Sequence, residues 1–509
     1  MRFLLPLLLV LSALVTVLLP GCEPKEDIVT TDSSARLEFA LDTVKFDTVF
    51  VSVGTVSKRL WVYNRNARAV RVAEISLQNR PGITYSLLVN GEVTLAARDV
   101  EIRGKDSLLV LVRATIDPTP NDLKPFLVVD DLKFRTNGNE QVVKVLSYGQ
   151  NAYFHNQEEI RRNTVWKADK PHVIFDYAFV DSLVTLTIEP GARIYSHAGA
   201  ALLVGGTLRC NADFRPTGEL KPTDRNFVRF QADRREEFYQ EIPGQWAGIW
   251  FLSSSRDNVV RFTEIKNSAF GLLVLNPKAL RPFPAVTVEN SVIQNISSAK
   301  QQFTNAGVSV GLDGAALLAL SGNFVARNVL MANCEQSAVT GFLGSSVQLD
   351  YCTIANYTTQ ANRQTPSVLL AAALRINGQL QTAAPRLTVR NSIVWGSMRE
   401  GEELEFVDGE QYAANISISN SVLKTKKYDN TGVLGQRKSG NILNPVEGPT
   451  YLFKSTPFRF RGKTLDYQLD TLSVAGNKAV PLPGLSTDLL NRLRNPTTPD
   501  IGAYERVNP

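Results

Sequence analysis

The chain has 509 residues, of which 44% are hydrophobic and 20% are charged, and its formal net charge is +6. This length allows a large buried core in two or three domains, and the composition excludes a disordered chain. No run of Lys and Arg is dense enough to indicate nucleic acid binding. Met is rare while Val, Thr, Ile and Leu are frequent, which favours β structure.

Residues 1–21 carry the strongest local signal. A positive start at Arg2 is followed by "FLLPLLLVLSALVTVLLPG", an apolar stretch that predicts a cleaved signal peptide. The sequence Leu-Pro-Gly-Cys at 19–22 resembles the lipobox of bacterial lipoproteins, in which the peptidase cuts before the Cys and the Cys thiol is diacylated. The resemblance implies a lipid on Cys22 that holds the protein on a membrane. An uncleaved membrane anchor is the alternative.

Residues 22–35 are polar and turn-rich, which predicts a tether. Within them, Lys25-Glu26-Asp27 resembles the export signal that sends Bacteroidota lipoproteins to the cell surface. The resemblance implies a lipid-anchored protein on the outer face of a bacterial outer membrane. An ordinary solvated linker is the alternative interpretation of these three residues.

Residues 36–150 alternate apolar and polar side chains in runs such as "KRLWVYNRN" and "SLLVLVRATI". Asn-Gly and Pro-Gly breaks separate the runs, so we predict about seven strands in an immunoglobulin-like β-sandwich. The stretch "DTVFVSVGTVSKRLWVYNRNARAVRVAEI" resembles the modules at the base of Bacteroidota surface lipoproteins. The resemblance implies a spacer without chemistry of its own.

A repeat begins in the second half of the chain. Five ten-residue segments align without gaps: "VTVENSVIQN" from Val286, "FVARNVLMAN" from Phe324, "VQLDYCTIAN" from Val347, "LTVRNSIVWG" from Leu387 and "ISISNSVLKT" from Ile416. "VVRFTEIKNSAFGLLV", from Val259 to Val274, is a looser sixth copy. A base unit of about 23 residues with insertions explains the spacing, and such a unit predicts a solenoid.

The repeat predicts short parallel strands separated by sharp corners. Positions one and three are apolar and fall on one face of a strand, while position five is Asn in four copies, and Asn tolerates a left-handed backbone. Stacked coils would place these asparagines above one another, each amide bonded to the next, which predicts a ladder of Asn290, Asn328, Asn391 and Asn420. The crossover rule favours a right-handed parallel β-helix over 151–465; a second antiparallel sandwich is the alternative.

The same region resembles the right-handed β-helix domain of Bacteroidota surface lipoproteins. The likeness rests on "VTLTIEPGARIYSHAGAALLVGGTLRCNA" and "GQWAGIWF", and at the C-terminus on Asp488, Arg494 and "DIGAYE". In that family the C-terminal module folds over the last coil, which implies that residues 466–509 form a closing cap. A solenoid needs such a cap because its last coil exposes unpaired strand edges.

No catalytic or metal site is predicted with these residues. Glycoside hydrolysis needs converging carboxylates, whereas Glu264, Glu289, Asp313 and Asp350 are scattered along the repeats. A calcium-assisted lyase would need a carboxylate cage beside a base such as Lys266 or Arg390. The pairs Glu236-Glu237 and Glu402-Glu403 are interpreted as solvated. The histidines His155, His172 and His197 are interpreted as ordinary surface or core residues. The cysteines Cys210, Cys334 and Cys352 are interpreted as buried thiols.

The remaining candidates are aromatic side chains and loops on the coil surface. Tyr351, Tyr357 and Trp395 are candidate platforms for sugars, and "RQTPS" and "MREGEE" are candidate loops beside a groove. The sequence thus predicts a membrane-anchored, non-enzymatic module that displays a surface to a polysaccharide or a protein. It requires no cofactor. The alternative is a calcium-assisted polysaccharide lyase or a glycosidase on the same fold.

Overall fold

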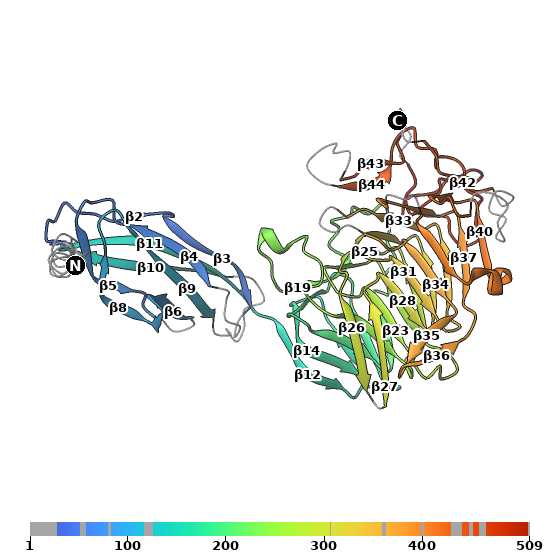
Figure 1. Cartoon of the computed structure of the whole chain (residues 1–509), viewed down its shortest axis with the longest axis horizontal. Helices are drawn as coiled ribbons and strands as arrows, with labels where there is room; N and C mark the ends of the chain where they lie inside the picture. Colours follow the sequence, from blue (N-terminus) through green and yellow to red (C-terminus); the bar gives the residue numbers. More distant parts are fainter. Residues whose placement is uncertain are drawn as a thin grey trace, which may run out of the picture. The chain divides into compact units, whose positions relative to one another are not determined.

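The computed structural model describes residues 28–50, 57–79, 83–116, 126–305, 307–358, 363–398, 402–428, 440–446, 451–457 and 465–506. The chain divides into two compact units, Met1–Asn151 and Ala152–Pro509 (Figure 1). In the described stretches the helices are two short 3-10 turns, η1 (Glu237–Tyr239) and η2 (Gly409–Asn415). Within these stretches no helix is both long and apolar enough to cross a membrane.

The first unit is a β-sandwich. Within its described residues, one sheet contains β1 (Val29–Thr30), β3 (Thr43–Phe50), β5 (Ala69–Ser76), β8 (Ala96–Ile102), β10 (Phe126–Thr136) and β11 (Asn139–Gln150). The other contains β2 (Glu38–Phe39), β4 (Lys58–Tyr63), β6 (Ile83–Val89), β7 (Glu92–Thr94) and β9 (Ser107–Ile116). Alternate side chains of both sheets meet in one core.

Local sequence explains the hairpins of this sandwich. Along β6 every second side chain is buried, as an alternating strand requires. Asn90-Gly91 joins β6 to β7 and Asn137-Gly138 joins β10 to β11, and all four residues have positive φ. This backbone matches the tight turn that Asn-Gly favours between antiparallel strands. The predicted immunoglobulin-like sandwich is confirmed.

The second unit is a parallel β-helix whose coils have three strands each. We call the three stacks of strands faces A, B and C. Face A contains β13 (Thr164–Trp166), β15 (Thr185–Ile188), β18 (Thr207–Cys210), β21 (Asn258–Arg261), β24 (Ala285–Glu289), β29 (Asn323–Arg327), β32 (Ser346–Asp350), β37 (Arg386–Arg390) and β40 (Ile416–Ser419).

Faces B and C join into one continuous sheet. Face B contains β16 (Arg193–Ser196), β19 (Val228–Ala232), β22 (Thr263–Lys266), β25 (Val292–Ile296), β30 (Leu330–Cys334), β33 (Thr353–Asn356), β38 (Ile393–Gly396), β41 (Val422–Leu423) and β42 (Ile442–Leu443). Face C contains β17 (Ala201–Val204), β20 (Gly248–Leu252), β23 (Leu272–Leu275), β28 (Leu317–Leu320), β31 (Val339–Phe342), β34 (Val368–Ala371) and β39 (Leu404–Val407). The first coils contribute β12 (Tyr153–Ile160) and β14 (His172–Val180). Strand β14 spans both faces, because it pairs with β16 of face B and with β17 of face C.

The strand register confirms the alignment of the five repeats. Their first residues pair in sequence, Val286 with Phe324, Phe324 with Val347, Val347 with Leu387 and Leu387 with Ile416. In the looser sixth copy the register begins at Asn258, which pairs with Val286, so that Phe262 takes position five. Positions one and three of each copy point into the core of the helix, which explains why they are apolar.

Position five is a left-handed corner between faces A and B. The predicted asparagines Asn290, Asn328, Asn391 and Asn420 have φ values of 48°, 53°, 50° and 49°. Tyr351 and Phe262 occupy the same corner with φ values of 51° and 41°. Left-handed backbone is unfavourable for Tyr and Phe, so their rings must gain contacts in the folded chain that outweigh this cost.

Two hairpins cover face C. They are β26 (Lys300–Asn305) with β27 (Val308–Asp313), and β35 (Ala373–Ile376) with β36 (Gln379–Thr382). Phe303, Leu312 and Ile376 of these hairpins pack on apolar side chains of face C such as Leu273. The insertions that lengthen some repeats are therefore used to bury one side of the coil.

The C-terminal segment lies along face B. We call residues 465–506 the strap; it begins with β44 (Asp466–Leu469), which pairs with β43 (Phe453–Ser455). In Figure 1 these strands lie beside β33 of face B. The strap also bonds early coils, since Leu490 O accepts a hydrogen bond from Leu220 N at 2.8 Å. The expectation that this segment folds over the last coil is corrected: it closes the helix along its side.

Candidate functional site

Face B changes from polar to apolar along the helix. Its outward side chains form two rows, because each strand stacks in register on the next. One row runs Glu264, Val292, Leu330, Thr353, Ile393, Val422, and the other runs Lys266, Gln294, Ala332, Ala355, Trp395. The strap packs on the apolar part of both rows. The polar part remains as the candidate functional site.

The strap buries the three aromatic side chains that the sequence suggested as sugar platforms. Tyr351, Tyr357 and Trp395 are only 0%, 5% and 6% exposed. The Tyr351 hydroxyl donates to Val480 O at 3.0 Å, and the guanidinium of Arg494 lies 4.0 Å from the centre of its ring. The prediction of surface platforms was therefore wrong. Trp395 does point outward from its strand, but a segment remote in sequence covers it.

The asparagine ladder also differs from the prediction. The position-five amides bond the strap and not one another: Asn290 donates to Asp488 O at 2.7 Å, and Asn328 donates to Thr487 O at 2.9 Å. Asn391 donates to Val480 O at 2.7 Å and accepts from Val480 N at 3.1 Å. Asn420 occupies the same corner near the end of the helix, beside Gly440. The corners at Asn290, Asn328 and Asn391 therefore anchor the strap.

Buried ionic groups hold the strap in shape. The Asp488 carboxylate accepts hydrogen bonds from the backbone N–H groups of Leu490, Arg492 and Glu505. Arg494 donates to Asn328 Oδ1 and to Gly502 O, both at 2.9 Å, and pairs with Glu505. The carboxylate of Asp500 binds Arg506 at 3.0 Å. The "DIGAYE" tail and its partners thus stabilise the closing segment.

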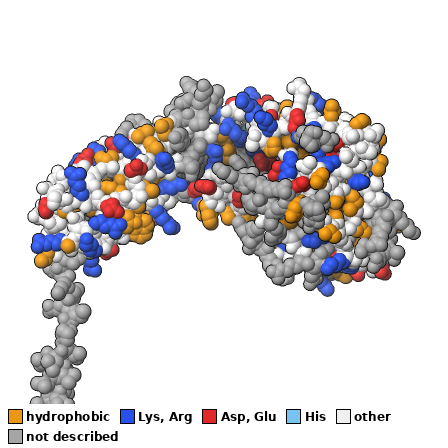
Figure 2. Space-filling view, turned by 90° about the horizontal axis from the view of Figure 1, so that it is seen from above, with side chains coloured by type: hydrophobic (Ala, Val, Ile, Leu, Met, Phe, Trp, Pro, Cys, Tyr) orange, Lys and Arg blue, Asp and Glu red, His pale blue; other side chains and the backbone are white. Residues whose placement is uncertain are grey.

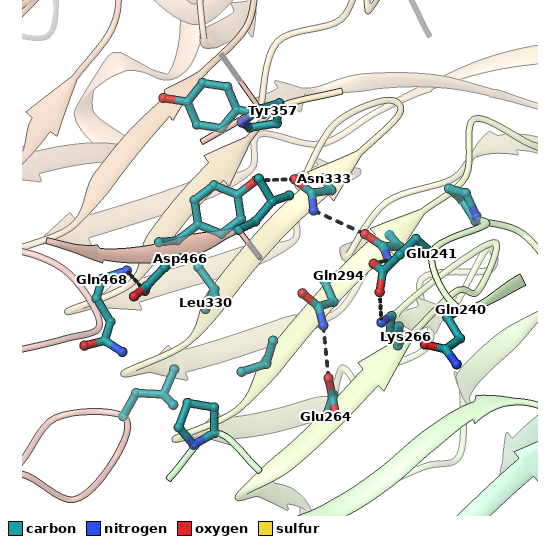
Figure 3. A pocket seen from close by; sticks show the side chains of 18 of the residues that line it. Gln240, Glu241, Glu264, Lys266, Gln294, Leu330, Asn333, Tyr357, Asp466 and Gln468 are labelled. Carbon is teal, nitrogen blue, oxygen red and sulfur yellow. Dashed lines mark hydrogen bonds and ion pairs between the residues drawn. The ribbon is translucent and has the colours of Figure 1, made fainter. Parts of the chain in front are cut away.

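The polar part of face B is a groove of about 850 Å³. Its floor comes from β22, β25 and β30, one wall from residues 237–243, and the other from the strap. Figure 2 shows acidic side chains in a hollow of the β-helix unit, with basic side chains around it. Figure 3 looks into the groove, where Asp466 and Gln468 lie on one side, Gln240, Glu241 and Lys266 on the other, and Gln294 and Glu264 between them.

An amide ladder forms one edge of the groove. At the corner between faces B and C, Asn333 donates to Asn295 Oδ1 at 3.3 Å, and Asn295 donates to Asn267 Oδ1 at 3.2 Å. The hydroxyl of Tyr467 in the strap completes the row by donating to Asn333 Oδ1 at 2.5 Å. Amides therefore do stack between coils, but at position ten of the repeat, where all three of these asparagines lie when the sixth copy is counted from Asn258. This fixed edge orients its polar groups without help from a ligand.

Two of the five acids that line the groove are paired with cations, whereas Glu237, Glu335 and Asp466 form no ion pair among the described residues. Lys266 Nζ lies 2.5 Å from Glu241, and Glu264 lies 3.3 Å from Arg229 and accepts from Gln294 at 3.0 Å. Burial raises the pKa of Tyr504, and the carboxylates of Asp466, Asp488 and Glu264 act in the same direction. Tyr504 thus stays a neutral donor near both Asp466 and Glu264. The groove offers an array of hydrogen-bonding groups together with an excess of negative charge.

The other acidic and basic candidates serve the structure. Glu289 binds Arg261 and Arg327 at 3.0 and 2.9 Å, while Asp350 binds Arg390 in a two-pronged pair at 2.7 and 2.8 Å. The third acid of the set, Asp313, is exposed at the end of β27, in a hairpin over face C. The four acids of the repeat region therefore do not meet at one point.

The two candidate loops meet in a buried ion pair. Arg363 of "RQTPS" donates to both carboxylate oxygens of Glu403, at 2.6 and 2.8 Å, and both side chains are almost fully buried. The interpretation of Glu403 as solvated was wrong, because its partner comes from another coil. Glu402 accepts from the backbone N–H groups of Lys426 and Lys427, and Glu237 lines the groove.

Two of the three histidines come together. His155 and His172 are buried, 2.9 Å apart between Nε2 and Nδ1, and both stack on Trp166. His197 instead contacts Asp233 at 2.7 Å. Within the described residues, no group of three or more His, Cys, Asp and Glu side chains is arranged to hold a metal ion. Burial lowers the pKa of His155 and His172, the latter to about 4.

The cysteines fall into two groups. Cys210, Cys334 and Cys352 are free and buried in the core of the helix, as predicted, and burial raises the pKa of each to about 12. Such thiols are unreactive at neutral pH. Cys22, the residue expected to carry the lipid, lies outside the described residues, as do the signal peptide and residues 22–27 of the tether, which include Lys25-Glu26-Asp27.

Comparisons with known proteins add little to this geometry. No family model and no curated protein matches the chain. A protein of unknown function from Porphyromonas gingivalis W83 aligns with 25% of this chain and 59% of its own, at 10% identity and a TM-score of 0.17. A family 123 glycoside hydrolase from Clostridium perfringens aligns over 22% and 26%, at 10% identity and a TM-score of 0.16.

A third solved structure covers a similar share of this chain. The PapD-like domain 7 of human CEP192 aligns with 26% of this chain and 97% of its own, at 13% identity and a TM-score of 0.16. All three scores are too low to support an argument about function. The fold and the groove rest on the geometry of this chain.

Sequence reasoning missed most of the groove. Glu241 comes from an irregular loop and Asp466 from the strap, and neither carries a periodic signal. Gln294 occupies an outward position of a repeat, and Asn295 and Asn333 occupy position ten, which the alignment had already marked as Asn. These three residues could have been found by following the outward and corner positions through the strand register.

Proposed function

We propose that this chain is a lipid-anchored protein of a bacterial outer membrane whose β-helix binds a glycan without cleaving it. The observation that carries the proposal is the groove of about 850 Å³, whose floor and two walls each contribute amides or carboxylates, beside apolar side chains such as Leu330 and Leu489. Sugar hydroxyls both donate and accept hydrogen bonds, so a rigid row of amides is a suitable surface for them. The lipobox at 19–22 supports the anchor, and the sandwich is the spacer between membrane and groove.

The proposal is tested with full-length protein purified in detergent on a glycan array. We expect binding to a set of glycans, and at least tenfold weaker binding when Gln240 and Gln468 are both changed to Ala. Gln302→Ala, in the exposed hairpin over face C, is the matched control and should bind as wild type. If the array is silent, or if the groove variant binds as wild type, the glycan proposal is wrong and a protein partner takes its place.

Glycoside hydrolysis is a second candidate, favoured by one observation. Glu264 lines the groove from β22 and Asp466 lines it from the strap, and both carboxylates raise the pKa of Tyr504. Two carboxyl groups on either side of a sugar are the requirement for such a reaction. Release of reducing ends from a bound glycan that is abolished by Asp466→Asn would establish it. Bound glycans that stay intact would reject it, and unsaturated products that need calcium would indicate a lyase.

A further inference from the structure

A second pocket, separate from the groove, opens on face A. It has a volume of about 410 Å³, within the range of small-molecule sites. Its base is formed by position four of successive repeats, where Arg261, Glu289, Arg327, Asp350 and Arg390 stack in register. Residues 482–487 of the strap form its rim.

The carboxylates of this pocket are already paired with arginines. Glu289 accepts from Arg327 Nη1 on one oxygen at 2.9 Å and from Arg261 Nε on the other at 3.0 Å. Asp350 is buried and accepts from Arg390 Nε and Nη2, and Gln348 also donates to it at 2.6 Å. The negative charge of both carboxylates is therefore already balanced by arginines within the pocket.

The guanidinium groups are not saturated. Within the described residues, Nε and Nη2 of Arg327 and Nη1 of Arg390 have no protein acceptor. The two side chains are 35% and 38% exposed, so these donors are accessible to a ligand. Three arginines and two carboxylates give the pocket a net charge of +1. Spare planar donors with a positive balance suit an oxygen anion, because guanidinium forks match carboxylate and sulfate geometry.

We infer that this pocket binds an anionic oxygen group, a sugar carboxylate or a sulfate. Residues 482–487 of the strap form its rim, and Leu489 and Leu490 line the groove on face B. If the glycan of the proposed function binds in the groove on face B, its charged substituent would reach across the strap into the pocket on face A. The ligand class is then an acidic polysaccharide, and this last step rests on the proposed function.

The site is tested apart from the groove by calorimetry on full-length protein in detergent with small probes: sodium glucuronate, sodium sulfate and neutral glucose. We expect glucuronate or sulfate to bind and glucose not to. Arg327→Gln should weaken binding at least tenfold, since it removes the spare donors but leaves Glu289 paired with Arg261. Arg209→Gln, in β18 of the same face but outside the pocket, should bind as wild type.

A second variant distinguishes an anion site from a merely structural ladder. Glu289→Gln removes one carboxylate and raises the net charge of the pocket, so anion binding should become tighter, whereas loss of structure would weaken it. Equal binding of glucose and glucuronate, no binding of any probe, or unchanged anion binding by Arg327→Gln would overturn the inference. The groove variant at Gln240 and Gln468 should leave anion binding intact, so failure of one site does not imply failure of the other.

Discussion

At the scale of single residues, burial decides what each ionisable group does. Glu402 and Glu403 are neighbours in a polar stretch, yet Glu403 is enclosed with Arg363 while Glu402 caps backbone N–H groups. No property of the two residues themselves separates these roles. The difference lies in the partner that the coil brings to each of them.

The Arg363–Glu403 pair gives a prediction about stability. Removal of one partner of a buried ion pair leaves an uncompensated charge and typically costs about 3–5 kcal/mol. We expect Arg363→Met to lower the free energy of unfolding by this amount in urea denaturation. The exposed pair Lys427–Glu405 is the control, and Glu405→Gln should cost less than about 1 kcal/mol. Equal effects of the two variants would contradict the structural role of the buried pair.

The buried histidine pair gives a prediction about pH. His172 lies between two partners, with Nε2 3.0 Å from Lys167 O and Nδ1 2.9 Å from Nε2 of His155. Burial lowers its pKa from 6.5 to about 4. Between these values the unfolded chain binds the extra proton and the folded chain does not. The free energy of unfolding should therefore fall as the pH falls through this window, by about 1.4 kcal/mol per pH unit at most.

His172→Gln checks this pH dependence. The variant should show a shallower fall in the free energy of unfolding between pH 6.5 and 4, whatever its stability at neutral pH. His197→Gln is the control, because the ring of His197 is half exposed beside Asp233. This variant should show the wild-type dependence of the free energy of unfolding on pH. A slope unchanged by His172→Gln would assign the pH dependence to other groups.

At the scale of elements, the corner between faces A and B has two functions. Asn391 has a left-handed backbone and also clamps Val480 of the strap through two hydrogen bonds. Asn391→Ala should lose both, at a cost of about 2–4 kcal/mol, whereas Asn391→Gly keeps the backbone freedom and should cost less. Thermal and urea unfolding would measure the difference.

Asn420 provides the matched control for this corner. It has the same backbone, with a φ of 49°, but lies at the last repeat, away from the strap residues bonded by the other asparagines. Asn420→Ala should therefore show only the backbone cost, roughly 1–2 kcal/mol. If Asn391→Ala costs no more than Asn420→Ala, the strap does not depend on its asparagine anchors.

The elements also show what the sequence could and could not predict. Strand order and register followed from positions one, three and five, because inward side chains and corners obey local rules that repeat in every coil. The covering of Trp395 did not follow, since it depends on residues more than 50 positions later with no periodicity of their own. The groove was missed for the same reason: its floor is periodic, but its walls are irregular segments.

At the scale of the whole molecule, the proposed lipid on Cys22 anchors the chain to a membrane and can be tested directly. If Cys22 is acylated, metabolic palmitate labelling should mark the wild type and not Cys22→Ala, because acylation of that thiol fixes the lipid. Cys352→Ala is the control and should keep the label, since that thiol is enclosed in the core. Protease treatment of intact cells should then remove the protein if it faces the outside. An unlabelled wild type would contradict the lipid anchor.

The strap has one consequence for the architecture of the helix. A solenoid ordinarily gains or loses a coil freely, because each coil contacts only its neighbours. Here Asn491 bonds Gly218, while Gly502 bonds Asn391 several coils away. One added coil would separate these attachment points by about 4.8 Å, more than a hydrogen bond can stretch. The length of the strap therefore fixes the number of coils between Gly218 and Asn391, and coils can be added or lost only outside that span.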